Sequence, residues 1–88
     1  MVVVRKREYL DGLKSIISYI ALDSVTRAKQ FKQQLDLKVE DLIHFPYKYR
    51  QSLHHNNNEV RDLIFKGYTI VYRINNDEKK IEIFKWTK

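Results

Sequence analysis

The spacing of apolar residues changes once along this 88-residue chain, and the change restricts the folds that the chain can adopt. Between Tyr9 and Ile43, apolar residues recur at steps of three and four, which is the period of an amphipathic helix. After Val60 they alternate with polar residues, which is the period of a strand with one buried face. The pattern therefore predicts helices first and an antiparallel sheet second, in an α+β fold.

Two helices are predicted in the first half. One stripe predicts a helix over residues 8–22 and consists of Leu10, Leu13, Ile16, Ile17 and Ile20. A second predicts a helix over 24–44 and consists of Val25, Ala28, Phe31, Leu35, Val39, Leu42 and Ile43. Asp23 and Ser24 supply oxygens that can cap the second helix, and Pro46 closes the segment. The short break between the helices predicts an antiparallel helical hairpin, with both stripes in the core.

Strands are predicted on both sides of this hairpin. The β-branched run Val2 to Val4 predicts an N-terminal strand, and residues 60–65, 68–74 and 81–86 predict a three-stranded antiparallel meander. Lys66-Gly67 and Asn75-Asn76-Asp77 separate the last three strands, as turn residues do. A short strand is also expected near 51–53, inside an otherwise irregular basic connection. Alternation places Tyr68, Ile70, Tyr72 and Ile74 on the face toward the helices.

Composition limits the class of protein. Eighty-eight residues with 43% hydrophobic and 32% charged side chains predict one folded domain over 1–88. The absence of cysteine excludes a disulfide scaffold, a zinc finger and a thiol nucleophile. The two glycines are too far apart for a phosphate loop, and the adjacent histidines have no third ligand at a recognisable spacing, so we expect no cofactor and no metal.

Charge predicts an anionic partner. Seventeen Lys and Arg against eleven Asp and Glu give a net charge of +6, which favours nucleic acid or an acidic protein. No apolar run approaches the roughly 18 residues of a membrane helix, and the N-terminal charges follow the apolar residues, opposite to a signal peptide. We therefore expect a soluble, cytoplasmic protein that does not contact membranes.

Four segments resemble a known family in their order and spacing. Tyr9 to Phe31 (YLDGLKSIISYIALDSVTRAKQF) is similar to the N-terminal helical hairpin of the RelE/ParE toxins of bacterial type II toxin–antitoxin, or plasmid stabilisation, modules. Pro46 to Ser52 (PYKYRQS) resembles the segment that enters their sheet, and VRDLIFKGYTIVYRI with IEIF resembles their strand core. The resemblance covers nearly the whole chain and implies a β-α-α-β-β-β fold.

The resemblance implies a cognate antitoxin and one of two targets. ParE-like members inhibit DNA gyrase, whereas RelE-like members cut messenger RNA on the ribosome with sheet arginines and a C-terminal Tyr or His. Thr69 stands where the ribonuclease pattern has an arginine, and no such acid or base follows Ile83. The ParE-like interpretation is therefore favoured, without a catalytic residue and with operator DNA contacted only through the antitoxin. The alternatives are a RelE-like endonuclease and a non-toxic nucleic-acid-binding domain.

Candidate residues for binding the target or antitoxin are cationic or aromatic: Lys48, Tyr49, Arg50, Arg61, Arg73 and Trp86. Each has a structural alternative. Arg61 could pair with Asp62 or Glu82 on a solvated sheet face, and Trp86 could close the core at the sheet edge. His54 and His55 lie in a polar, Asn-rich segment without a third ligand, which favours plain surface, although a histidine would be the base in the endonuclease alternative.

Overall fold

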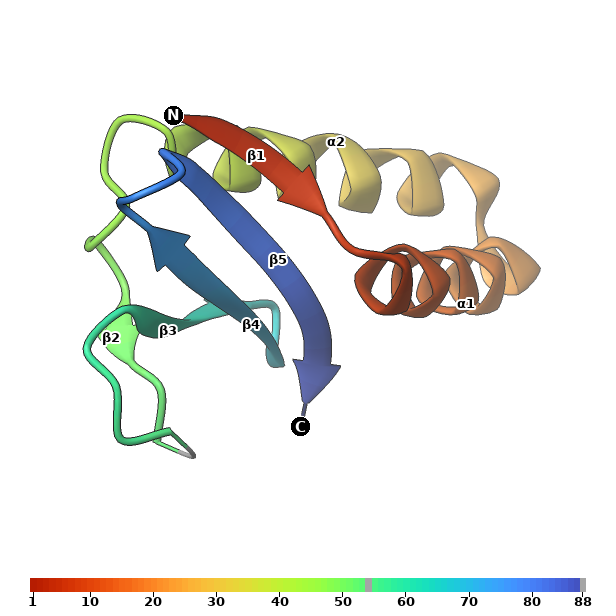
Figure 1. The fold of residues 1–88 in the computed structure, drawn as a ribbon. Helices are drawn as coiled ribbons and strands as arrows, with labels where there is room; N and C mark the ends of the chain where they lie inside the picture. Colours follow the sequence, from red (N-terminus) through yellow and green to blue (C-terminus); the bar gives the residue numbers. More distant parts are fainter. Residues whose placement is uncertain (54, 88) are drawn as a thin grey trace.

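The computed structural model describes residues 1–53 and 55–87, so the prediction for His54 lies outside the described residues. Its elements are β1 (Val2–Arg5), α1 (Arg7–Asp23), α2 (Val25–Asp41), β2 (Arg50–Gln51), β3 (Val60–Phe65), β4 (Tyr68–Asn75) and β5 (Lys80–Thr87). The α+β fold is confirmed, with an N-terminal strand, a helical hairpin and a final meander (Figure 1). None of the described helices is long and apolar enough to cross a membrane.

The strands form one five-stranded sheet in the order β1-β5-β4-β3-β2. Strand β1 pairs parallel with β5, so that Val3 lies opposite Ile81, and all other neighbours are antiparallel. The predicted N-terminal strand therefore joins the sheet beside the last strand of the chain. Strand β2 has only two residues and begins one residue before the short strand expected near 51–53.

The helical hairpin turns where the capping residues predict it. The Ser24 side chain accepts a hydrogen bond of 3.1 Å from the backbone N–H of Arg27, and the Arg27 side chain pairs with Asp23. Helix α2 ends at Asp41, three residues earlier than predicted. The backbone N–H groups of Leu42 and Ile43 bond to carbonyls three residues back, which tightens the last turn before Pro46.

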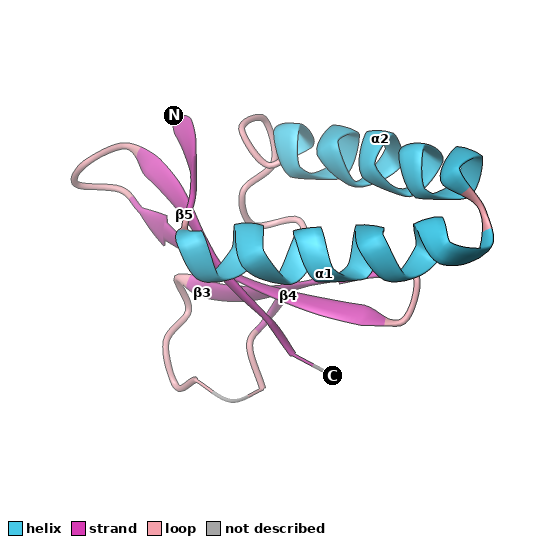
Figure 2. Ribbon diagram, turned by 90° about the vertical axis from the view of Figure 1, so that its right-hand side faces the viewer, coloured by secondary structure: helices cyan, strands magenta, loops and turns pink. Residues whose placement is uncertain are grey.

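The core lies between the helices and one face of the sheet. The buried residues include Leu13, Phe31, Leu35, Val39 and, from β4, the predicted Ile70, Tyr72 and Ile74. Both helices lie on this side of the sheet, and the turn between them lies away from the strands (Figure 2).

The prediction that both helical stripes are entirely core is wrong at three positions, because Leu10, Val25 and Ile43 are 45%, 59% and 39% exposed. Tyr9 is fully buried instead of Leu10, which rotates the buried face of α1 by one residue at its start. Val25 lies in the first turn of α2, at the end of the hairpin away from the strands, and Ile43 follows the last helical residue.

Candidate functional site

Arg61 holds the connection between α2 and β3. Its Nε donates to the Asn58 carbonyl at 2.8 Å and its Nη1 to the Tyr49 carbonyl at 3.0 Å, while Nη2 donates to the Asn58 side chain. The guanidinium carbon also lies 4.9 Å from the centre of the Tyr47 ring. One side chain from the second residue of β3 therefore contacts the connection on both sides of β2. Asp62 and Glu82, the partners expected for a solvated arginine, pair with other cations.

Tyr72 fastens the start of the same connection. Its hydroxyl donates a hydrogen bond of 2.7 Å to the Pro46 carbonyl, and burial raises the pKa of the phenol above its usual value. Arg61 lies directly opposite Tyr72 in the pairing of β3 with β4. A buried phenol and a guanidinium on adjacent strands thus fix a segment that has only two residues of strand.

Arg50 and Asp62 are paired at the sheet edge. The Arg50 guanidinium lies 3.7 Å from the Asp62 carboxylate, which is 1% exposed and also accepts from the Leu53 backbone N–H at 3.4 Å. The Ser52 hydroxyl and His55 Nδ1 lie 3.1 Å apart in the same segment. The Arg50 charge is therefore partly compensated.

Lys48 and its neighbours form a different surface. The Lys48 ammonium donates to Asp41 at 3.1 Å, and this hydrogen bond raises the lysine pKa. Phe45, Tyr47 and Lys48 line a hollow of about 520 Å³, and Phe45 is 58% exposed. This is an apolar surface beside a cation, a combination that is common in protein interfaces.

Trp86 packs across α1 at the opposite end of the sheet. Its indole N–H donates to the Tyr9 carbonyl at 2.9 Å, and its ring stacks on Tyr9 with centroids 5.5 Å apart. A side-chain carbon added at Gly12 would lie 2.4 Å from Trp86 Cδ1, so glycine is what allows this approach. Half-buried Trp86 thus closes the core at the sheet edge.

Arg73 lies on the other face of the sheet. A hollow of about 540 Å³ opens there, and its lining includes Glu8, Asn57, Val71, Arg73, Phe84 and Lys85. Among the residues that the structure describes, neither Arg73 nor Lys85 makes an ion pair or a side-chain hydrogen bond. Two cations therefore remain without a carboxylate partner on this open face.

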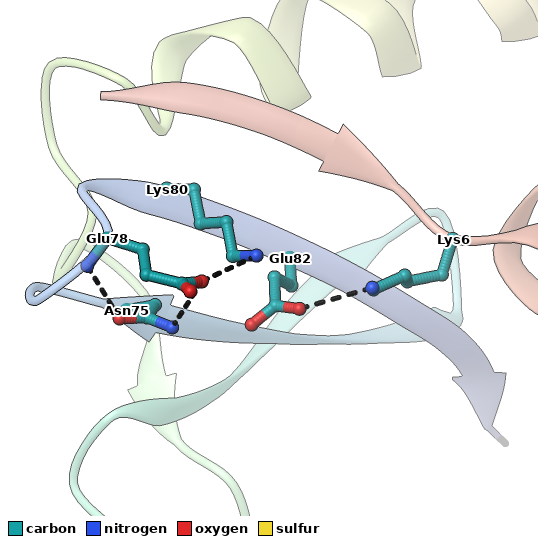
Figure 3. A network of polar contacts seen from close by, with 5 residues as sticks. All are labelled: Lys6, Asn75, Glu78, Lys80 and Glu82. Carbon is teal, nitrogen blue, oxygen red and sulfur yellow. Dashed lines mark hydrogen bonds and ion pairs between the residues drawn. The ribbon is translucent and has the colours of Figure 1, made fainter.

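Next to the hollow, the charges are paired. Lys6 lies 3.3 Å from Glu82, and Lys80 lies 2.7 Å from Glu78, which also bonds Asn75 (Figure 3). The Lys80 ammonium lowers the pKa of Glu78, and Glu78 raises that of Lys80. Lys6 and Lys80 thus have ion-pair partners, which Arg73 and Lys85 lack among the described residues, although Glu82 lies opposite Arg73 in the pairing of β4 with β5.

The comparisons with known proteins agree with this architecture. A family model described as "ParE toxin of type II toxin-antitoxin system, parDE" matches residues 3–85. The chain belongs to the ParE toxin family. A solved structure titled "Chromosomal ParDE TA system from P. aeruginosa" superimposes with a TM-score of 0.76 at 19% sequence identity, covering 100% of this chain and 95% of that chain. No curated protein matches the chain.

Within this ParE-family fold, the predicted binding residues do not form one site. Lys48, Tyr49, Arg50 and Arg61 belong to the α2–β3 connection and its anchor, as the contacts above show. Arg73 lies on the open face, and Trp86 packs against α1. Thr69, on which the choice of the ParE-like branch rested, lies opposite Thr87 in the pairing of β4 with β5.

Sequence reasoning missed Phe84 and Lys85 as neighbours in the hollow of this ParE-family chain. Strict alternation after Ile83 would place them on opposite faces, and no turn residue signals a departure from it. It also missed the exposed Phe45 and Tyr47, although an aromatic pair around Pro46 was visible in the sequence.

Proposed function

We propose that this ParE-family protein is a toxin that inhibits DNA gyrase by binding it and trapping its DNA-cleaved state. The observation that carries the proposal is the family match over residues 3–85, which covers both helices and almost the whole sheet. Trapping a bound enzyme requires a stable contact surface and no bond making by the toxin. We place the toxin in the cytoplasm, where gyrase and its DNA are found.

The target surface that we propose is the α2–β3 connection. It joins exposed aromatic side chains, Phe45 and Tyr47, to the cation Lys48. Aromatic residues and cations supply much of the affinity in protein interfaces. Arg61 supports this surface by contacting the Tyr47 ring and the Tyr49 carbonyl, so it is a positioning residue.

A cognate antitoxin is expected to neutralise the toxin across the helical hairpin and the sheet edge. The hairpin exposes large apolar side chains, of which Leu22 is 86% exposed. Strand β2 pairs with Asp62 and Arg61 but not with residues 63–65, which leaves the outer edge of β3 open to an added strand. The +6 charge favours an acidic antitoxin and raises the association rate at low salt. Operator DNA is then contacted through the antitoxin.

The test is a supercoiling assay with purified gyrase and relaxed plasmid. The wild-type protein should block supercoiling, and a cognate antitoxin should restore it. Arg61→Glu should weaken inhibition more than a double change of His54 and His55 to alanine, because Arg61 orders the proposed target surface. Lys29→Glu, a charge reversal on the exposed side of α2, is the matched control.

Two results would contradict the proposal. One is full supercoiling in the presence of folded toxin. The other is cleavage of messenger RNA on translating ribosomes that disappears in the double histidine variant, which would favour the RelE-like alternative. For the antitoxin, binding that leaves amide exchange in the hairpin and at the β3 edge unchanged would refute the proposed contact.

A further inference from the structure

A register shift in β5 brings two consecutive side chains to the same face of the sheet. Val71 pairs with Lys85, but the next residue of β4, Tyr72, pairs with Ile83, so Phe84 is the extra residue of a bulge. Ile83 before the bulge is buried in the core, and Trp86 after it packs on Tyr9. Phe84 and Lys85 both line the hollow on the open face. The bulge thus places an aromatic ring beside a cation.

The hollow joins this pair to a second cation. Arg73 lies on β4 two residues after Val71, on the same face, and both residues line the hollow. Arg73 and Lys85 lack ion-pair partners among the described residues, whereas the neighbouring cations Lys6 and Lys80 have them. Arg73 and Lys85 thus line one hollow without an ion pair to the described residues, although Glu82 lies opposite Arg73 in the strand pairing and Glu8 also lines the hollow. An arginine fork and a lysine charge are the groups that bind phosphate.

We propose that this hollow binds one nucleotide, with its phosphate between Arg73 and Lys85 and its base against Phe84. About 540 Å³ is within the usual range for small-ligand pockets. Aromatic side chains bind bases by stacking, which every base permits. Asn57 also lines the hollow; its Oδ1 accepts a hydrogen bond of 2.9 Å from the Glu59 backbone N–H, and its NH₂ group can donate to a base edge.

Glu8 favours one orientation of a nucleotide bound in the hollow. It lies in the first turn of α1 and also lines the hollow. Its carboxylate repels phosphate and accepts hydrogen bonds from ribose hydroxyls or a base amino group. The phosphate is therefore directed to Arg73 and Lys85, and the sugar or base to the α1 side. The hollow includes Asn57 of the α2–β3 connection but none of Phe45, Tyr47 and Lys48, so this proposal does not depend on the proposed target.

The experiment is a titration of the full-length ¹⁵N-labelled protein followed by amide chemical shifts. The probes are adenosine 5′-monophosphate, adenosine, inorganic phosphate and a single-stranded octanucleotide. We expect saturable shifts at Val71, Arg73, Phe84 and Lys85 with the monophosphate, and at least tenfold weaker binding of adenosine. The octanucleotide identifies the source of the phosphate: much tighter, salt-dependent binding indicates a nucleic-acid strand, and equal binding indicates a free nucleotide.

Amino-acid substitutions distinguish binding in this hollow from nonspecific attraction of a phosphate to a basic protein. Arg73→Gln with Lys85→Gln should weaken monophosphate binding at least tenfold, while Lys14→Gln with Lys29→Gln removes the same charge from the helices and should change it less than twofold. Phe84→Leu should weaken the monophosphate but not inorganic phosphate. The proposal is overturned if no saturable shifts occur on the open face, or if both double variants lose affinity equally. Gyrase inhibition would survive that result, so the two proposals fail separately.

Discussion

Truncation of Arg61 to alanine tests the anchoring of the α2–β3 connection. The change removes three hydrogen bonds, two to carbonyls at 2.8 and 3.0 Å and one to the Asn58 side chain, together with the contact to the Tyr47 ring. The acceptors that remain lie in a largely exposed segment, so water can replace the guanidinium. The two Asn58 acceptors are exposed, and the Tyr49 carbonyl is only partly buried.

The expected loss in the free energy of unfolding can be estimated from these contacts. Each hydrogen bond contributes about 1 kcal/mol and the cation–π contact about 0.5 to 1 kcal/mol. Truncation also releases about 2 kcal/mol of side-chain rotamer entropy that the folded state had restricted. The net loss in the free energy of unfolding is therefore about 2 kcal/mol, which leaves most domains of this size folded, since they have about 5 to 15 kcal/mol.

Urea unfolding and native-state amide exchange measure this loss. Arg61→Ala should lower the free energy of unfolding and accelerate exchange of the Val60 amide, which bonds to the Asn57 carbonyl. Arg73→Ala removes an arginine of the adjacent strand that makes no ion pair or side-chain hydrogen bond with the described residues, and it should lower the free energy of unfolding by less than about 0.5 kcal/mol. Equal losses in the two variants, or an unchanged Val60 exchange rate in Arg61→Ala, would refute the anchoring role.

Three further predictions concern the core. Gly12→Ala should lower stability by about 1 to 3 kcal/mol in thermal unfolding, because the added carbon would lie 2.4 Å from Trp86 Cδ1; wild-type stability would contradict this packing. Tyr72→Phe should lower the free energy of unfolding by about 1 kcal/mol, because it removes the hydrogen bond to the Pro46 carbonyl. Tyr9→Phe should leave stability unchanged or raise it, because the buried Tyr9 hydroxyl has no partner among the described residues. The reverse order of stabilities in urea unfolding would contradict this. Burial raises the pKa of Tyr9 from 10.0 to about 12 and also raises the pKa of Tyr72. The unfolded chain therefore loses these phenol protons at lower pH than the folded chain does. Above pH 10 the free energy of unfolding should fall by about 1.4 kcal/mol per pH unit for each tyrosine. Each Phe variant should flatten that decline, and an identical slope in wild type and variants would count against it.

The fold was largely predictable because its elements have strong periodic patterns. The strand over 60–65 has the predicted bounds, and the Ser24 cap sets the start of α2 as its side chain suggests. The errors occur where tertiary contacts decide which residue faces the core. Tyr9 is buried in place of Leu10 because Trp86, from the far end of the chain, packs on its ring.

The candidate site was less predictable than the fold. The cations in the connection could be found from the sequence. Two of the three acceptors of Arg61 are backbone carbonyls, however, and a backbone carbonyl is present at every residue, so the sequence does not indicate which ones Arg61 contacts. Phe84 and Lys85 face the same side of the sheet because of a β-bulge in β5, and no residue in this part of the sequence indicates that bulge. Alternation alone would have separated the two side chains.

The most direct test of the central claim is the amount of linear DNA that gyrase releases after denaturation. Purified toxin, gyrase and closed circular plasmid are incubated, and the products are then treated with detergent and protease. If the toxin traps the cleaved state, linear plasmid should accumulate with toxin concentration and disappear when cognate antitoxin is added first. Plasmid that remains closed and becomes fully supercoiled at toxin concentrations above that of gyrase would contradict the claim.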